Sequence, residues 1–117
     1  RIEICKLLFD RKDTFHFSIS DLKNNLENLS SKKISLATIY NTIHAFREKG
    51  YLKEISINSD KTYFDTNTSD HHHFFDESKK KLIDLNDNDV GKIKIKKTLP
   101  GKKIKSVEIL VRIANDN

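Results

Sequence analysis

The sequence predicts an α+β protein, in which an N-terminal winged helix-turn-helix domain precedes a small α/β dimerisation domain. Three observations support this fold class. Residues 35–50 place apolar residues at helical spacing, with polar residues on the opposite face. Two β-prone runs, YLKEISI and KTYFD, follow at once and are joined by a turn at residues 58–60. Beyond residue 70 the apolar residues alternate, which is typical of strands.

The segment 35–50 is predicted to be a DNA-recognition helix. Its apolar stripe consists of Leu36, Ile39, Ile43 and Phe46. Ser35 is a good N-cap, and Gly50 stands where a left-handed residue ends many helices. A surface helix that only faces water is the alternative, which the following hairpin disfavours. The candidate DNA-contacting residues are Lys33, Ser35, Thr38, Tyr40, Asn41 and Lys61.

The rest of the first domain reads as two more helices. A helix is expected over residues 1–9, with Ile4, Leu7 and Leu8 on its inner face, and residues 11–17 form a polar connection that contains His16. Ser18 and Asp21 resemble a capping box that starts the next helix. The inner face of that helix is expected to hold Leu22, Leu26 and Leu29, and residues 30–34 make the turn. Residues 1–65 thus form the winged-helix domain, and residues 66–70 form a hinge.

Residues 71–117 are predicted to form a small sheet. HHHFFD and LIDL are β-prone runs separated by lysines, Ile93 and Ile95 alternate with lysines, and alternation returns over residues 107–113. A sheet of this size buries little on its own. We therefore expect a homodimer, which would also let two recognition helices read two half-sites.

Composition narrows the partners of the chain. Of its 117 residues 36% are hydrophobic, which favours a core completed by a second chain. The net charge of +5 favours a polyanionic partner, but residues 1–65 carry 11 basic against 9 acidic side chains and residues 66–117 carry 11 against 8. Because this excess is diffuse, a DNA footprint would have to come from local clusters such as Lys32, Lys33 and Lys61.

The single cysteine and the apolar runs indicate the compartment. Cys5 lies among apolar residues, so we expect a buried thiol, and one cysteine excludes an internal disulfide. No run approaches the about 18 apolar residues of a membrane span, and no signal-peptide pattern is present. We therefore expect a cytoplasmic protein with no membrane partner.

Three consecutive histidines are the strongest chemical signal. On a strand, His71 and His73 would share one face and His72 the other, so one strand could serve two sites. His16 and Asp65 are the candidate partners for a metal site formed across the hinge. Imidazole and carboxylate without thiolate suit Fe(II), Mn(II) or Zn(II), and haem could instead take one or two of these imidazoles. The plainer alternative is a run of exposed polar strand residues.

The runs YNTIHAF and KTYFDTNTSDHHHFF resemble the ferric uptake regulator family, and more narrowly its iron response regulator branch, which is associated with haem sensing. The resemblance covers residues 1–113. It implies a dimer with a winged-helix domain, a hinge and a C-terminal α/β dimerisation domain, with regulatory metal bound between the two domains. Tyr40 matches the family's recognition-helix tyrosine, His16, Asp65 and residues 71–73 match its ligand positions, and the histidine run matches a proposed haem site.

Several departures from the family pattern have consequences. Asn41 stands where arginine is usual, so base preference should differ, and asparagine reads adenine well. Both Cys-x-x-Cys pairs of the family's structural zinc site are missing from this sequence, so we expect no such zinc. No histidine follows His73, so an acidic helper ligand could only be Asp87 or Asp89.

The sequence therefore predicts a dimeric transcription regulator, mainly a repressor, that responds to metal or haem and controls iron and haem genes through AT-rich operators. The alternative is a winged-helix regulator whose C-terminal sheet only dimerises, with an incidental zinc site. A metal-dependent hydrolase built on His16, Asp65 and the histidine run is disfavoured, because no candidate nucleophile or base accompanies the ligands. We expect no enzymatic activity.

Overall fold

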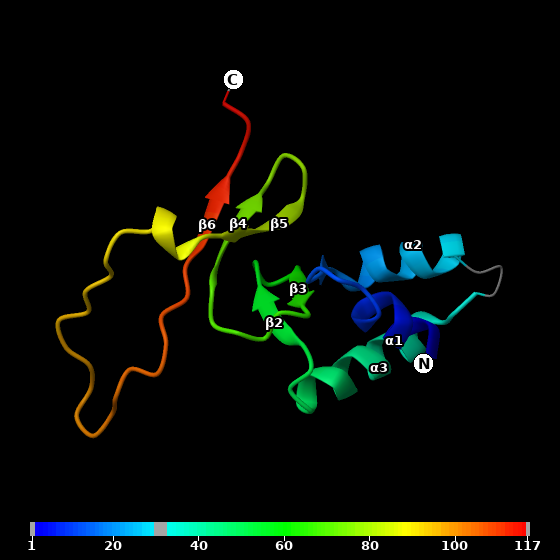
Figure 1. Ribbon diagram of the computed structural model, residues 1–117, viewed down its shortest axis with the longest axis horizontal. Coiled ribbons are helices and arrows are strands. Elements are labelled where there is room, and N and C mark those ends of the chain that lie inside the picture. Colours follow the sequence, from blue (N-terminus) through cyan, green and yellow to red (C-terminus); the bar gives the residue numbers. More distant parts are fainter. Residues whose placement is uncertain (1, 30–32, 117) are drawn as a thin grey trace. The chain divides into compact units, whose positions relative to one another are not determined.

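The computed structural model describes residues 2–29 and 33–116, and the chain divides into two compact units, Arg1–Thr68 and Ser69–Asn117 (Figure 1). The division falls within residues 66–70, where the sequence suggests a hinge. The fold is α+β, as expected, with a helical winged-helix region followed by a β-sheet unit. The predictions for Arg1, Lys32 and the turn residues 30–32 lie outside the described residues.

The first unit packs three helices against a three-stranded sheet (Figure 1). Its strands lie in the order β1-β3-β2, and both pairs are antiparallel. Phe17, Ile39 and Ile43 are fully buried at the centre of one apolar core that draws on all three helices. The elements are α1 (Ile2–Phe9), β1 (His16–Phe17), α2 (Ile19–Leu29), α3 (Leu36–Glu48), β2 (Lys53–Ser56) and β3 (Thr62–Asp65).

The predicted helix ends are confirmed by their hydrogen bonds. Before α2, the Ser18 N–H donates to Asp21 Oδ2 at 3.3 Å and the Asp21 N–H donates to Ser18 Oγ at 3.1 Å, which is a reciprocal capping box. Ser35 caps α3 by accepting from the Thr38 N–H at 3.2 Å. Gly50 has φ +82°, in the left-handed region that ends this helix.

Four local predictions about the first unit are wrong. Residues 11–17 are not all connection, because β1 pairs with β3 in a two-residue strand too short to show periodicity. Leu29 and Leu36 are 72% and 48% exposed, since they lie in the last turn of α2 and the first turn of α3, beyond the helix packing. Cys5 is only half-buried.

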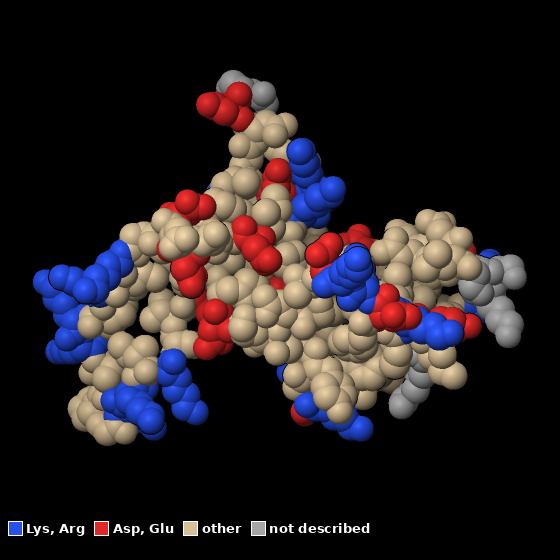
Figure 2. Space-filling model, in the orientation of Figure 1, with Lys and Arg blue, Asp and Glu red and all other residues tan. Residues whose placement is uncertain are grey.

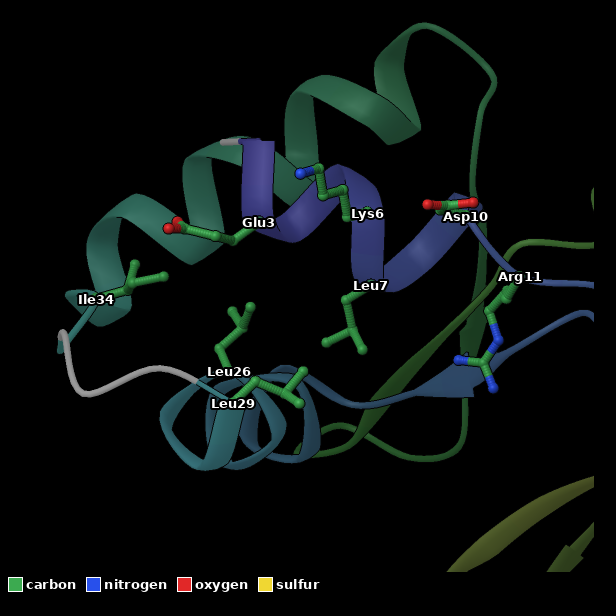
Figure 3. A pocket seen from close by; sticks show the side chains of 8 residues that line it. All are labelled: Glu3, Lys6, Leu7, Asp10, Arg11, Leu26, Leu29 and Ile34. Carbon is green, nitrogen blue, oxygen red and sulfur yellow. The ribbon is translucent and has the colours of Figure 1, made fainter.

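An apolar pocket of about 480 Å³ lies between α1 and α2 (Figure 3). Leu7, Leu26 and Leu29 point into it, and charged side chains of α1 and the following residues form part of its wall. None of the residues labelled in Figure 3 is a histidine. The pocket is therefore separate from the predicted metal ligands.

The second unit is a three-stranded sheet in the order β5-β4-β6. Its elements are β4 (His72–Asp76), β5 (Lys81–Leu85), the 3-10 turn η1 (Asp87–Asp89) and β6 (Leu110–Ile113). Strands β4 and β5 form the expected hairpin, and β6 pairs with β4 in parallel. In the hairpin turn, Asp76 Oδ1 accepts from the N–H groups of Ser78 and Lys79, and Lys80 has φ +54°.

The expected strand around Ile93 and Ile95 does not form. No strand is assigned anywhere in the described stretch 90–109, and these two side chains are 38% and 53% exposed. Strand β6 begins at Leu110 instead of residue 107. Alternation alone does not make a strand, because a strand also needs a neighbour to complete its hydrogen-bond ladder. Among the described helices, none is long and apolar enough to cross a membrane.

Candidate metal-binding and DNA-binding residues

Within the second unit, His71, His73 and Asp84 bring their donor atoms together. His73 lies opposite Asp84 in the β4–β5 ladder, and His71 lies two residues earlier, so both imidazoles project from one face. Their ring centres are 4.2 Å apart. Asp84 Oδ1 lies 3.2 Å from His71 Nε2 and 3.5 Å from His73 Nε2. The three donors lie within 4.8 Å of one another, which suits a shared cation.

Backbone contact fixes the tautomer of His71. Its Nδ1 lies 2.7 Å from the Ser69 carbonyl oxygen. Because a carbonyl oxygen only accepts, Nδ1 must carry the proton and donate it. The Nε2 atom, which faces Asp84, is then the atom with a lone pair to offer a metal. Metal-binding histidines commonly gain their orientation from such a bond at the other ring nitrogen.

His72 lies on the opposite face of β4, as the strand geometry predicts. Its Nδ1 accepts from the Ile109 N–H at 2.9 Å, so the lone pair of that nitrogen is already used. Its Nε2 lies 3.8 Å from Asp87 Oδ1. His72 therefore ties β4 to the residue before β6. It is not a member of the cluster of His71, His73 and Asp84, although the sequence grouped all three histidines as candidate ligands.

Within the first unit, His16 and Asp65 form a second set of donors. The two residues face each other across the β1–β3 ladder, and His16 Nε2 lies 3.0 Å from Asp65 Oδ2. The Asp65 carboxylate is buried, and its Oδ1 accepts from the Asn67 N–H at 2.8 Å. A buried carboxylate with an imidazole partner is a common element of metal sites and of structural ion pairs.

The donor chemistry fits a small divalent ion better than haem. Imidazole nitrogens with carboxylate oxygens suit Fe(II), Mn(II) and Zn(II). Haem would need a flat apolar pocket beside its axial imidazole, whereas the Nε2 atoms of His71 and His73 both face the charged carboxylate of Asp84.

The prediction of Asp87 or Asp89 as the acidic helper is wrong for this cluster, because Asp84 occupies that place. Asp84 sits on the neighbouring strand β5, opposite His73. Sequence reasoning missed it because hairpin register decides which residues of β4 and β5 face each other. The available signal was the spacing within LIDL, because residues two apart on a strand share a face. Asp84 therefore lies on the face of Leu82, opposite the face of Ile83 and Leu85.

Most of the predicted DNA-contacting residues are exposed on or near the first turns of α3. Thr38, Tyr40 and Asn41 are exposed on the helix, and Lys33 is exposed before it. The Ser35 hydroxyl is engaged in capping and lies 2.8 Å from Thr38 Oγ1. Residues at the start of a recognition helix are those that commonly reach base edges.

The wing carries the remaining DNA candidate. Lys61 is half-buried in the turn between β2 and β3, where its N–H donates to Asn58 Oδ1 at 2.9 Å. His44 packs its ring 5.2 Å from that of Tyr40 and so supports the exposed aromatic side chain. The first unit thus has the helix and hairpin of a winged helix, with few basic side chains on them.

A family match identifies the chain more closely. Residues 1–112 match the ferric uptake regulator family. The chain belongs to this family. Ferric uptake regulators are transcription regulators and not enzymes, which agrees with the prediction that the chain has no enzymatic activity.

Two curated relatives in the ferric uptake regulator family share part of this sequence. The peroxide operon regulator of Bacillus subtilis (strain 168) is 36% identical over 70 residues, which cover 60% of this chain and 48% of that protein. The peroxide-responsive repressor PerR of Staphylococcus aureus (strain USA300) is 38% identical over 52 residues, which cover 44% of this chain and 35% of that protein. The matches span about half or less of the length of these relatives.

Solved structures of ferric uptake regulators share the fold. The regulator from Vibrio cholerae has a TM-score of 0.73 at 17% identity, over 97% of this chain and 87% of that one. The regulator from Francisella tularensis with iron has a TM-score of 0.71 at 15% identity, over 97% of this chain and 86% of that one. At such low identity the likeness establishes the fold alone.

Proposed function

We propose that this chain is a dimeric, metal-responsive DNA-binding transcription regulator that acts in the cytoplasm, mainly as a repressor. The observation that carries this proposal is the convergence of His71, His73 and Asp84 on one face of the second unit, in a chain whose first unit is a winged helix. Tyr40, Asn41 and Thr38 would read base edges, and Lys33 and Lys61 would contact phosphates.

The regulatory ligand of this proposal is a divalent ion held by His71, His73 and Asp84. Three donors are fewer than the four to six that such ions usually take. The family resemblance adds His16 and Asp65, and this part of the proposal rests on the sequence and on the pair that they form within the first unit. Ligands on both sides of the hinge would couple metal occupancy to the orientation of the recognition helices.

Iron and haem genes are the proposed targets. The resemblance of YNTIHAF and of the histidine run to the iron response regulator branch supports this choice, and it keeps haem as a ligand to be tested. A peroxide response is the second candidate, because two relatives carry that response in their names. The remaining alternative is a constitutive winged-helix dimer whose histidines bind zinc incidentally.

The deciding experiment measures binding to an AT-rich iron-gene promoter by the metal-stripped protein, alone and with Mn(II), Fe(II), Zn(II) or haem. The Fe(II) sample is also exposed to peroxide. A variant with His71→Ala and His73→Ala together is compared with Asp89→Asn, which removes an exposed carboxylate outside the donor cluster. We expect one ion to change the affinity at least tenfold, which is about 1.4 kcal/mol of coupling.

The outcomes separate the candidates. Loss of the response in the double histidine variant alone, with DNA binding retained, supports the metal sensor. A response to haem and to no ion favours the haem-sensing branch, and a response of the Fe(II) form to peroxide favours the second candidate. Equal binding by all proteins under all conditions contradicts the sensor and leaves the constitutive dimer.

A further inference from the structure

A lysine-rich excursion leaves the sheet of the second unit between η1 and β6. We call residues 92–105 the lysine arm. Figure 1 draws it in yellow to orange, within the long excursion that leaves the sheet after β5 and returns to it at β6. At its tip the Lys102 N–H donates to the Leu99 carbonyl at 3.1 Å, and Gly101 has φ +74°. With Pro100 before Gly101, this is the pattern of a type II turn.

The seven lysines of the lysine arm exceed the net charge of +5 that the whole chain carries. All fourteen of its residues are exposed, and it contains no Asp or Glu. The other 103 residues carry 15 basic against 17 acidic side chains, so without the lysine arm the chain would be slightly negative. Figure 2 shows the basic side chains gathered along this segment. The lysines are Lys92, Lys94, Lys96, Lys97, Lys102, Lys103 and Lys105.

The winged-helix unit, in contrast, carries little net positive charge for a DNA-binding domain. Residues 1–68 carry 11 basic against 9 acidic side chains. The hollow between α3 and the wing is lined by Tyr40 and His44, and also by the acidic residues Glu54 and Asp60. Phosphate neutralisation by lysine and arginine supplies most sequence-independent affinity for duplex DNA. Basic side chains outside this unit would therefore add to the phosphate contacts that Lys33 and Lys61 can make.

We propose that the lysine arm is a second DNA-contacting surface, which binds the phosphates of duplex DNA without reading sequence while α3 reads the bases. This inference rests on the proposed DNA-binding function and deepens it. Lysine suits the role because its ammonium is a flexible point charge that tolerates any local phosphate geometry. In an extended chain Lys92, Lys94 and Lys96 project from one face, which gives a row of charges.

The same features argue against two other binding partners for the lysine arm, a second copy of the arm and a membrane surface. A second copy of the lysine arm would place seven positive charges against seven, and like charges across paired strands are destabilising. A membrane surface is commonly met by an amphipathic helix, whereas no helix is assigned within residues 92–105, all of which the structure describes. The exposed Ile93, Ile95 and Ile104 stand singly between lysines and do not form a continuous apolar face.

The test uses metal-free full-length protein and a labelled AT-rich duplex of arbitrary sequence, about 40 base pairs long, because phosphate contacts do not depend on sequence. Its Kd is measured by fluorescence anisotropy at several salt concentrations. One variant changes three arm lysines to glutamine, and a matched control changes three exposed hairpin lysines of the same unit. The variants are Lys102→Gln, Lys103→Gln and Lys105→Gln together, and Lys79→Gln, Lys80→Gln and Lys81→Gln together. A second arm variant carries Lys92→Gln, Lys94→Gln and Lys96→Gln.

Log K falls with log salt, and each lost phosphate contact makes this fall less steep by about 0.9. Either arm variant should therefore reduce the steepness by about 2 to 3. At about 0.1 M salt its affinity should fall at least tenfold. The hairpin control should keep the wild-type slope. Equal slopes in the wild type and both arm variants overturn the inference, and so does an equal loss in the hairpin control.

Two further measurements distinguish this inference from a membrane contact and from the proposed metal response. The first is binding to vesicles of phosphatidylserine and phosphatidylcholine. If the wild type binds these vesicles, the arm variants do not, and their salt slopes on DNA are unchanged, the lysine arm is a membrane contact and the inference is overturned. The metal response on promoter DNA is scored independently. A slope difference without any metal response supports the lysine arm and defeats the proposed sensor, whereas a metal response with equal slopes does the reverse.

Discussion

Three neighbouring histidines of identical chemistry have two different environments. His71 donates through Nδ1 to a backbone carbonyl and turns Nε2 towards Asp84, whereas His72 accepts a backbone N–H at Nδ1. The two residues therefore hold opposite tautomers when neutral. His73 lies on the same side as His71, and its Nε2 also faces Asp84. One ring nitrogen and its hydrogen-bond partner thus separate a candidate metal donor from a histidine that links two strands.

Asp84→Asn should weaken metal binding at least tenfold, because the amide removes the negative charge that the two Nε2 atoms share. Isothermal titration with Mn(II) and Zn(II) measures this change. Asp89→Asn, on η1 of the same unit, is the matched control and should bind as the wild type does. An Asp84→Asn protein that binds both ions at wild-type affinity would remove Asp84 from the proposed ligand set.

Tyr63 should make the free energy of unfolding fall as the pH rises above about 10. Burial, with a smaller effect from the nearby charge of Asp21, raises the pKa of Tyr63 above its ordinary value of 10.0. The stability that this group contributes is fully present below the unfolded pKa, near pH 10, and is lost as the pH rises through the higher folded pKa. In Tyr63→Phe, the fall in unfolding free energy above about pH 10 should be shallower than in the wild type.

Denaturant unfolding between about pH 9 and pH 11 measures the Tyr63 contribution. The control is Tyr51→Phe, because Tyr51 is 55% exposed in the folded protein and so is not a buried tyrosine. That control should keep the wild-type steepness. If Tyr63→Phe and Tyr51→Phe change the pH dependence equally, burial of Tyr63 is not its cause.

At the scale of elements, the C-terminus of α3 shows how local chemistry orients the wing. The Tyr51 N–H donates to the Phe46 carbonyl at 2.9 Å and the Gly50 N–H donates to the Arg47 carbonyl at 3.0 Å, which is a Schellman motif. The rings of Phe46 and Tyr51 lie 6.3 Å apart and add the apolar contact that accompanies this motif. The chain then turns directly into β2, so the geometry of Gly50 sets where the wing begins.

Gly50→Ala should destabilise the protein by about 1 kcal/mol, because an L side chain is disfavoured at φ +82° even though its Cβ would meet no atom within 4 Å. Gly91→Ala is the control, since Gly91 also has open space and has no left-handed φ. Denaturant unfolding measures both proteins, and Gly91→Ala should match the wild type or exceed it slightly. Equal stability of the two variants would show that backbone strain at Gly50 is negligible.

At the scale of the whole molecule, the two units differ in how much core they have. The first unit buries an apolar cluster drawn from three helices and a sheet. In the described part of the second unit, the buried apolar side chains are Phe75, Leu82 and Leu85. A three-stranded sheet with so little apolar burial is marginal alone. Ferric uptake regulators bind their operators as dimers, and this sheet gives a physical reason for a dimer here.

We therefore predict that the chain is dimeric and that its thermal midpoint rises with protein concentration, because folding of the second unit is linked to association. Sedimentation velocity and thermal unfolding over a roughly hundredfold concentration range measure both properties. Glu108→Gln, at an exposed position just before β6, is a control that should leave both unchanged. A monomer with a concentration-independent midpoint would contradict this prediction.

Features that depend on neighbours along the chain could be predicted from the residues alone. The helix caps at Ser18 and Ser35, the left-handed Gly50, the wing hairpin and the opposite faces of His71 and His72 all follow from spacings of a few residues. Periodicity likewise located the helices and the β4–β5 hairpin. Such features are readable because the forces that make them act over one or two turns of helix or one step of a strand.

Features that depend on pairing between distant segments became visible only in the folded chain. Strand β1 exists because β3 lies beside it, Asp84 meets His73 through the hairpin register, and Ile93 stays outside the sheet because no strand pairs with it. Leu29 and Leu36 show the same limit, since each fits the apolar stripe of its helix and is exposed where packing ends. Register and packing join residues far apart in sequence, and no local pattern records which segments meet.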